Sequence, residues 1–291
     1  MFSERSAIDE RDFLGAMDAG DPLEHVVPTA GGVLASLLLL CDPGDEALMP
    51  EPSHPSVAHA AQLAGVSLAP YPLRYEDGRW GIDSAALWDA IGERTRAVLA
   101  SSPNDITGAL LSEEELELLD SLGIPLVLDR RLARHPLEAR GVAASIEATS
   151  LRLTLDGDEA GEWIAVSGPH AQVHEALARL APIARALGVP APTTLDPIAR
   201  ARASLTALRE ELAGSALEVP PVDAGWNAPI KLPPGAPDEE WAQRLREHGL
   251  IAAPGSSLAF PDEERWLVLG LLADPEQVRL AARALRELSK P

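Results

Sequence analysis

The sequence predicts an α/β fold, with a large domain built on a mainly parallel sheet and a smaller α+β domain after it. The clearest sign is a strand, loop, helix and strand in succession over residues 95–132. Short apolar runs also alternate with helical patterns through the first half of the chain, which is typical of parallel sheets. After Gly168-Pro169 the character changes, because a long helical pattern begins there.

The length of 291 residues is enough for one large or two ordinary domains. We expect an N-terminal arm over residues 1–22, a large α/β domain over residues 23–169 and a small α+β domain over residues 170–291.

Apolar runs bounded by turn residues predict the strands, and apolar residues at helical spacing predict the helices. In the large domain we expect strands at 23–27, 46–49, 66–71, 96–100, 124–128, 151–155 and 163–167, and helices at 33–41, 56–64, 83–91 and 112–122. In the small domain we expect helices at 170–187, 198–212, 239–248 and 275–288, and strands at 217–221, 228–232 and 266–271.

The central unit carries the clearest local signals. Ser112 begins a Ser-Glu-Glu-Glu capping pattern, and leucines at helical spacing follow it. The two flanking apolar runs are short enough to be buried parallel strands, which need a crossover helix between them. Ligands of open α/β sheets bind beyond the carboxyl ends of the strands, and Asp105 and Asp129 fall at those ends.

Composition excludes several classes of function. Hydrophobic residues make up 46% of the chain and aromatic residues 4%, so the core must be mainly aliphatic. The net charge of -21 and the isoelectric point near 4.6 argue against binding to nucleic acid and to anionic membranes. The polar start is not a signal peptide, and the apolar run at 33–41 is too short to span a bilayer. We therefore expect a cytoplasmic protein, in which the single cysteine, Cys41, is a buried hydrophobic residue.

Four segments in order resemble the class I/II aminotransferases, which are fold-type-I pyridoxal-phosphate (PLP) enzymes. The segments cover residues 42–65, 95–119, 123–132 and 240–260. The third is the Gly-Ile-Pro-Leu-Val-Leu-Asp run, and the fourth contains a Pro-Gly-Ser turn. The resemblance implies the PLP-dependent transferase fold, like that of aspartate aminotransferase, and a homodimer.

The resemblance also implies positions around a cofactor. Asp129 falls where the family pairs an aspartate with the pyridine nitrogen, and His54 falls where an aromatic ring stacks on the cofactor. Asp105 stands in place of the signature asparagine, with Asn104 beside it in the same loop. A Gly31-Gly32 pair opens a helix, and a helix N-terminus can hold a phosphate.

Several of the family's functional positions have other residues. The lysine that holds PLP as a Schiff base falls near Leu155, so we assign no catalytic residue. The phosphate-binding arginine is replaced by Glu162 and Trp163, the carboxylate-binding arginine by Val268, and an active-site tyrosine by Leu132.

No lysine elsewhere is placed to substitute. The chain contains two, Lys231 in the small domain and Lys290 near the C-terminus. A buried phosphate and phenolate call for cations and donors, whereas this cleft gains acids. We predict that the chain is a truncated and degenerate member of the family, which has no cofactor.

The first hypothesis is therefore a pseudoenzyme, a non-catalytic binding, structural or regulatory homologue that does not act as an enzyme. One alternative is an enzyme that uses PLP, or its amine form PMP, without an internal aldimine lysine. A second alternative is a cofactor-independent enzyme with a carboxylate-rich cleft. Asp105, Asp129, Asp156 and Asp158 could gather in that cleft, although we predict no metal site. The partners that we expect are a second copy of the chain and a small molecule in the cleft.

Overall fold

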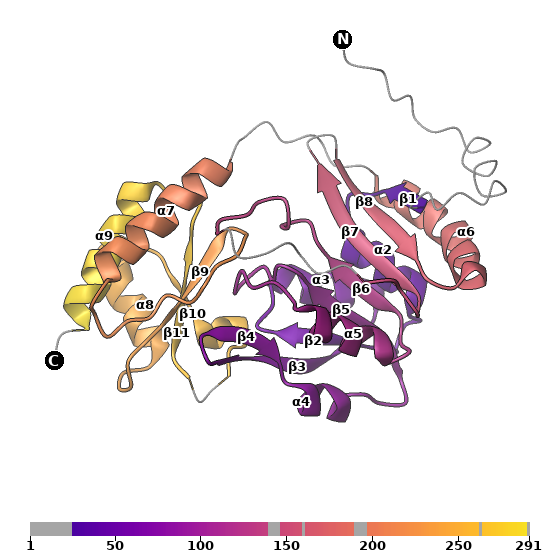
Figure 1. Ribbon diagram of the computed structural model, residues 1–291, viewed down its shortest axis with the longest axis horizontal. Helices are drawn as coiled ribbons and strands as arrows, with labels where there is room; N and C mark the ends of the chain where they lie inside the picture. The colour runs from indigo at the N-terminus through magenta and orange to yellow at the C-terminus, as the bar shows by residue number, and fades with distance from the viewer. Residues whose placement is uncertain (1–24, 139–145, 159–160, 189–196, 262–263, 290–291) are drawn as a thin grey trace, which may run out of the picture.

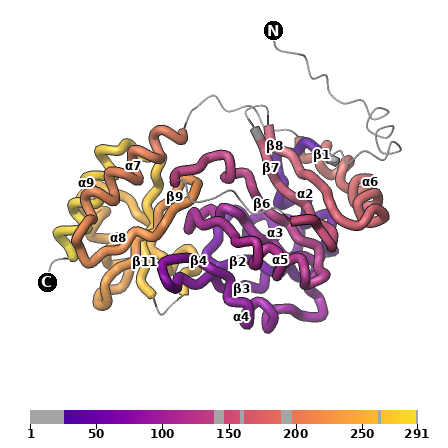
Figure 2. The backbone as a smooth tube through the Cα atoms, in the orientation of Figure 1, coloured from indigo at the N-terminus to yellow at the C-terminus, as the bar shows by residue number. Residues whose placement is uncertain are grey.

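The computed structural model describes residues 25–138, 146–158, 161–188, 197–261 and 264–289 (Figure 1). The arm predicted over residues 1–22 lies outside the described residues. The described residues form two sheets, one of eight strands and one of three. Figure 2 shows the smaller sheet and its helices gathered at the end of the molecule that carries the C-terminus.

The large sheet has the strand order β1-β8-β7-β6-β5-β2-β3-β4. The five strands from β7 to β3 run parallel. Strands β8 and β4 pair antiparallel with β7 and β3 at the two ends of this group, and β1 pairs antiparallel with β8. The bounds are β1 His25–Pro28, β2 Glu46–Glu51, β3 Ser67–Glu76, β4 Arg79–Ile82, β5 Thr95–Ser101, β6 Leu126–Asp129, β7 Arg152–Asp158 and β8 Gly161–Ser167.

Helices cover both faces of this sheet, which confirms the predicted α/β class. They are α2 Gly32–Leu40, α3 Pro55–Ala64, α4 Ser84–Asp89, α5 Glu113–Ser121 and α6 His170–Leu187. Helices α2, α3 and α6 bury aliphatic residues against one face, where Cys41 is also buried. Helix α6 packs on the large sheet through residues such as Leu177 and Leu180. The predicted boundary after residue 169 assigns this helix to the small domain, although it covers the sheet of the large one.

Local signals explain where these elements begin and end. The capping box of α5 is present, since Ser112 and Glu115 each accept a hydrogen bond from the other's backbone amide. Helix α3 ends at Gly65, which has a φ of 72° that disfavours other residues. Strands β5 and β6 are parallel neighbours, so the predicted central unit is confirmed.

The small sheet has the antiparallel order β10-β11-β9. Its strands are β9 Asn227–Lys231, β10 Ala253–Pro254 and β11 Trp266–Gly270, and its helices are α7 Pro197–Leu212, α8 Asp238–Glu247, the 3-10 turn η1 Gly255–Leu258 and α9 Pro275–Leu288. Figure 1 shows α7 and α9 side by side over this sheet. Among the described residues, no helix has the length and apolar character needed to cross a membrane.

Three strand predictions needed correction. The strand expected at 217–221 is wrong, because only Glu218 forms a bridge there, to Lys231. Strand β4 was not predicted; it forms a hairpin with β3, which runs five residues beyond its predicted end at residue 71. The strands predicted at 151–155 and 163–167 are both longer than expected, because β7 and β8 continue into the polar segment between them as a second hairpin.

The β3–β4 hairpin joins the two sheets through aromatic side chains. Trp80 of β4 lies 4.9 Å from Trp266 of β11, measured between ring centroids, and 5.7 Å from Phe260. Tyr75 of β3 meets Trp266 edge-on at 5.6 Å. Such ring contacts stabilise beyond the apolar area that they bury, so the two parts share one core.

A buried ion pair fixes the loop that leads into β7. Arg152 Nη2 lies 2.9 Å from Asp120 Oδ1, and their side chains are 6% and 4% exposed. Asp120 also accepts hydrogen bonds from the backbone amide and hydroxyl of Thr149. Burial acts to raise the pKa of Asp120, but the hydrogen bonds from Thr149 and Arg152 outweigh it, and the net pKa is lowered.

We predict that Asp120→Asn destabilises the protein by about 3–5 kcal/mol, because it leaves the Arg152 charge buried without a counter-charge. Urea unfolding at neutral pH measures this change. Because the carboxyl has a lowered pKa when folded, its contribution is present above the unfolded pKa of about 4 and is lost as the pH falls through the folded value. The difference between the two proteins should therefore shrink in acid.

The matched control is Glu240→Gln, which removes an exposed ion pair with Arg244 one helical turn away. That change should cost less than about 1 kcal/mol. Equal losses for the two variants would refute a special role for the buried pair.

Candidate functional site

The carboxyl ends of β5, β6 and β7 meet at one edge of the large sheet. Their register pairs Ser101 with Asp129 and Asp129 with Leu155. Neighbouring strands lie about 4.8 Å apart, so the position predicted for the lysine is directly beside the predicted ring-nitrogen aspartate. The sheet thus brings the two together as the resemblance implies, with a leucine in place of an amine.

Leu155 is buried against the start of α2. Its side chain is 1% exposed. A methyl group placed on Gly32 would lie 3.0 Å and 3.2 Å from the two δ carbons of Leu155, so the leucine fills the space that the glycine leaves. Gly32 therefore allows close packing of α2 on β7, which is a structural role.

The chain's own groups also surround the amides before α2. Ala30 donates its backbone amide to the Gly188 carbonyl at 2.7 Å, and Thr29 donates its amide to the Glu162 carbonyl at 3.1 Å. The Gly31 amide donates to the Thr29 hydroxyl at 3.3 Å. A helix N-terminus binds a phosphate through such amides, and three of them already have partners here.

Arg131 engages the Asp129 carboxylate. Its Nη2 lies 2.6 Å from Oδ2 and its Nε lies 3.0 Å from Oδ1. The remaining nitrogen, Nη1, lies 3.0 Å from Glu162 Oε2. The cleft edge therefore has an ion-pair network in which Arg131 joins Asp129 at the end of β6 to Glu162 of β8.

Asp105 lies close enough to this network to interact electrostatically with Asp129 and Arg131. It is largely buried, and its Oδ1 has no hydrogen-bond partner among the described residues. Burial and the charge of Asp129 raise the pKa of Asp105, while His54 and Arg131 act to lower it. The structure therefore gathers Asp105, Asp129, His54 and Arg131 at one edge of the sheet.

His54 and Asn104 have structural contacts. His54 is exposed and caps α3, because its Nδ1 accepts a hydrogen bond from the Ser56 amide. Asn104 is buried: it donates to the Pro52 carbonyl at 3.1 Å and accepts from the amides of Ile106 and Thr107. Asn104 therefore holds the loop in shape.

Lys231 does not supply the missing amine. Its strand, β9, does approach the cleft, since the Asn227 side chain donates to the Asp105 carbonyl at 2.8 Å. Lys231 is four strand residues further on, about 13 Å away. Its ammonium pairs with Glu264 and lies 5.4 Å from the centre of the Tyr75 ring. Lys290 lies outside the described residues.

These contacts do not fit PLP held in the manner of the family. The position of the lysine is apolar and buried, the amides before α2 are bonded within the chain, and Asp129 has an arginine partner. A phosphate dianion and a phenolate would also meet Glu162 and Asp105, which are acids.

The carboxylates of the second alternative do not gather as a metal site in the part of the chain that the structure describes, where no group of three or more potential ligands occurs. Asp156 instead lies 3.6 Å from Arg134. The side chain of Asp158 is outside the described residues.

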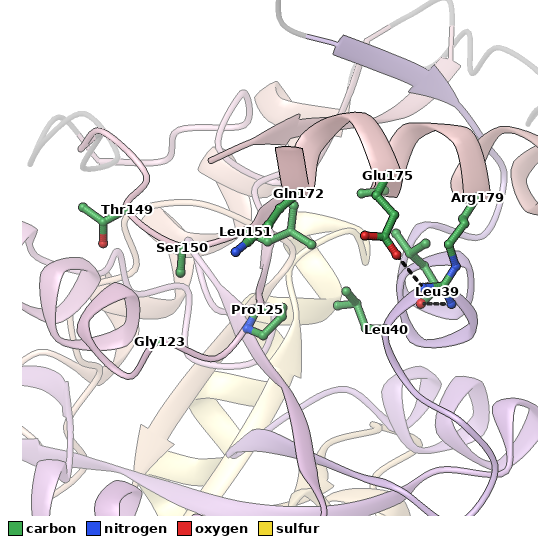
Figure 3. Close-up of a pocket in the computed structure, with 11 residues that line it drawn as sticks. Leu39, Leu40, Gly123, Pro125, Thr149, Ser150, Leu151, Gln172, Glu175 and Arg179 are labelled. Carbon is green, nitrogen blue, oxygen red and sulfur yellow. Dashed lines mark hydrogen bonds and ion pairs between the residues drawn. The ribbon is translucent and has the colours of Figure 1, made fainter. Parts of the chain in front are cut away.

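A pocket of about 400 Å³ lies elsewhere, at the opposite edge, where β6 and β7 begin (Figure 3). Leu39 and Leu40 of α2 line it together with residues of α6. Arg179 of α6 donates to the Leu39 carbonyl at 3.0 Å and lies 3.9 Å from Glu175, so the charged group of the pocket is already engaged. The pocket is thus separate from the cleft at Asp129.

The fold and the strand-end aspartate define a member of the PLP-dependent transferase fold, and residues 26–130 match the family described as aminotransferase class I and II. The match runs from β1 to the residue after β6, and the chain is similar to this family over that segment. It is 36% identical over 108 residues to a probable N-succinyldiaminopimelate aminotransferase of Mycobacterium tuberculosis, covering 36% of this chain and 27% of that protein. It is 33% identical over 151 residues to the L-glutamine:2-deoxy-scyllo-inosose aminotransferase of Streptomyces paromomycinus, covering 50% of this chain and 34% of that one.

Solved structures share the fold over most of the chain. An amino transferase of Eubacterium rectale superimposes with a TM-score of 0.77 at 19% identity, covering 95% of this chain and 77% of that one. The tyrosine aminotransferase of Leishmania infantum gives a TM-score of 0.76 at 17% identity, covering 96% and 80%. In sequence, however, the chain matches about a quarter of the length of the first curated relatives. The family match ends before Leu155.

The packing of Leu155 on Gly32 predicts a coupled pair of substitutions. Leu155→Ala should cost about 2–5 kcal/mol, because it leaves a cavity over α2. Gly32→Ala alone should also destabilise, because its methyl group presses on Leu155. In the double variant the methyl group enters the cavity, so the double variant should be more stable than Leu155→Ala.

Denaturant unfolding of the four proteins gives this coupling directly. Gly270→Ala is the control, since a methyl group there meets no atom within 4 Å. Additive effects of Leu155→Ala and Gly32→Ala would show that the two residues do not pack together.

Proposed function

We propose that this chain is an aminotransferase-family protein whose Asp129 cleft works without a lysine-bound cofactor. The observation that carries the proposal is Leu155, which stands beside Asp129 in the sheet and packs against Gly32. Without an amine at this position, the described residues of the cleft include no group that forms or exchanges a Schiff base. The pairing of Asp129 with Arg131 supports the same conclusion.

The geometry favours a non-catalytic homologue with a binding, structural or regulatory role. At the edge of the cleft Leu155 is buried and apolar, and Arg131 forms ion pairs with Asp129 and Glu162. These contacts are typical of residues that stabilise a fold. A family fold hosts different functions when its site residues change. The hydrogen bonds that the backbone amides before α2 donate to Gly188 and Glu162 add to this argument.

The comparisons favour a second candidate, an enzyme that binds PLP or PMP without the lysine. Each relative reported above is named as an aminotransferase, and nothing in them indicates lost activity. Asp129 also keeps its place at the end of β6. A cofactor-independent enzyme is favoured by one observation, the raised pKa of Asp105, which is a property of general acids.

Absorbance spectroscopy separates the first candidate from the second. We predict that protein mixed with excess PLP or PMP and then desalted shows no cofactor absorbance, because the lysine position is apolar and Asp129 is paired. An active aminotransferase that binds PLP, treated in parallel, is the positive control. A retained chromophore that Asp129→Asn removes would establish the second candidate and overturn the first.

We also propose that the chain forms a homodimer, as the family resemblance implies. Sedimentation velocity at micromolar concentration should show a species of twice the mass of the 30.8 kDa chain. A single monomer peak across the concentration range would contradict the dimer. The cytoplasmic location expected from the sequence stays a prediction.

A further inference from the structure

Arg131 makes a paired contact with the carboxylate at the end of β6. Its Nε lies 3.0 Å and 3.1 Å from the two Asp129 oxygens, and its Nη2 lies 2.6 Å from Oδ2. The Arg131 backbone amide also donates to Asp129 Oδ1 at 3.0 Å. Backbone and side chain of one residue therefore hold the same carboxylate, which fixes the guanidinium in one orientation.

The other side of the guanidinium reaches the antiparallel strand β8. Nη1 lies 3.0 Å from Glu162 Oε2. Arg131 thus spans two strands that are separated by β7, the strand of Leu155. Burial acts to lower the pKa of Arg131, but its hydrogen bonds and charge interactions with Asp129 and Glu162 outweigh burial and raise it.

A protonated pyridine and a guanidinium offer the same chemistry to a carboxylate. Each is a flat, charge-delocalised cation that donates an N–H group in its plane. We propose that Arg131 is an internal occupant of the cleft, which gives Asp129 the cationic N–H contact that a bound pyridinium ring would otherwise give. This inference rests on the proposed function, since a cofactor bound at Asp129 would have to displace Arg131.

The surrounding acids explain why a cation is needed here. Asp129 and Glu162 both contact Arg131, and Asp105 senses the charges of Asp129 and Arg131. Removal of the guanidinium would leave these acids without the cation between them. The vacated position should then accept a small planar cation of the guanidinium class from solution.

The experiment is chemical rescue of Arg131→Ala with methylguanidinium chloride. We expect the variant to unfold several degrees below the wild type, and millimolar methylguanidinium to restore more than half of that loss. Sodium chloride at equal ionic strength should not restore it, and neither should methylammonium, which is not planar. If Arg131→Ala does not fold, Arg131→Gln takes its place. Arg131→Gln retains most of the side-chain length without the charge, and it should unfold several degrees below the wild type.

Two further variants separate a specific site from a general salt effect. Arg134→Ala removes a neighbouring arginine, which pairs with Asp156, and should not respond to methylguanidinium. The double variant Asp129→Asn with Arg131→Ala should lose the rescue, because the carboxylate that holds the cation is gone.

The outcomes also distinguish this inference from the proposed function. If the wild type retains PLP and Asp129→Asn releases it, both are overturned. If the wild type binds no PLP and methylguanidinium stabilises Arg131→Ala no better than sodium chloride does, the internal occupant alone is overturned. Rescue that needs Asp129, in a wild type that binds no PLP, supports both.

Discussion

The parallel register of β5, β6 and β7 is the constraint on which the cleft depends. It places Ser101, Asp129 and Leu155 in one row across the sheet edge. A change at one position of such a row alters what its neighbours can contact, because strands are less than 5 Å apart. With a leucine in the row, the start of α2 packs directly on β7, and the charge that Asp129 needs must come from another element.

Arg131 supplies that charge from the chain that leaves β6. A partly buried carboxylate is stable only with a cation or donors around it, so the aspartate and its partner have to change together. The pairing of Arg131 with Glu162 extends the same requirement to β8. An aspartate at this position therefore indicates a need for a cationic partner, and does not by itself identify that partner as a cofactor.

The helices with strong local signals were predicted well, since α6 and α9 begin and end at the expected residues. Strand β4 pairs with its neighbour β3, but it was missed because Trp80 packs on Trp266 and Phe260, which come from a distant part of the chain. The same reason limited the site. The resemblance predicted that Leu155 and Asp129 would be neighbours, whereas the Gly188 carbonyl reaches the start of α2 only because α6 folds back on it.

The fold does not need cleft chemistry to be stable. The aliphatic core under α2 and α6, the core of the small sheet and the aromatic core between them are each complete within the described residues. Lys231, the lysine that the structure describes, packs its ammonium on the rings of Tyr75 and Trp266 and pairs with Glu264, so its amine stabilises the junction of the two sheets. Leu155 at the carboxyl edge is itself part of the aliphatic core under α2, so the leucine at this position adds to the packing and the architecture is kept.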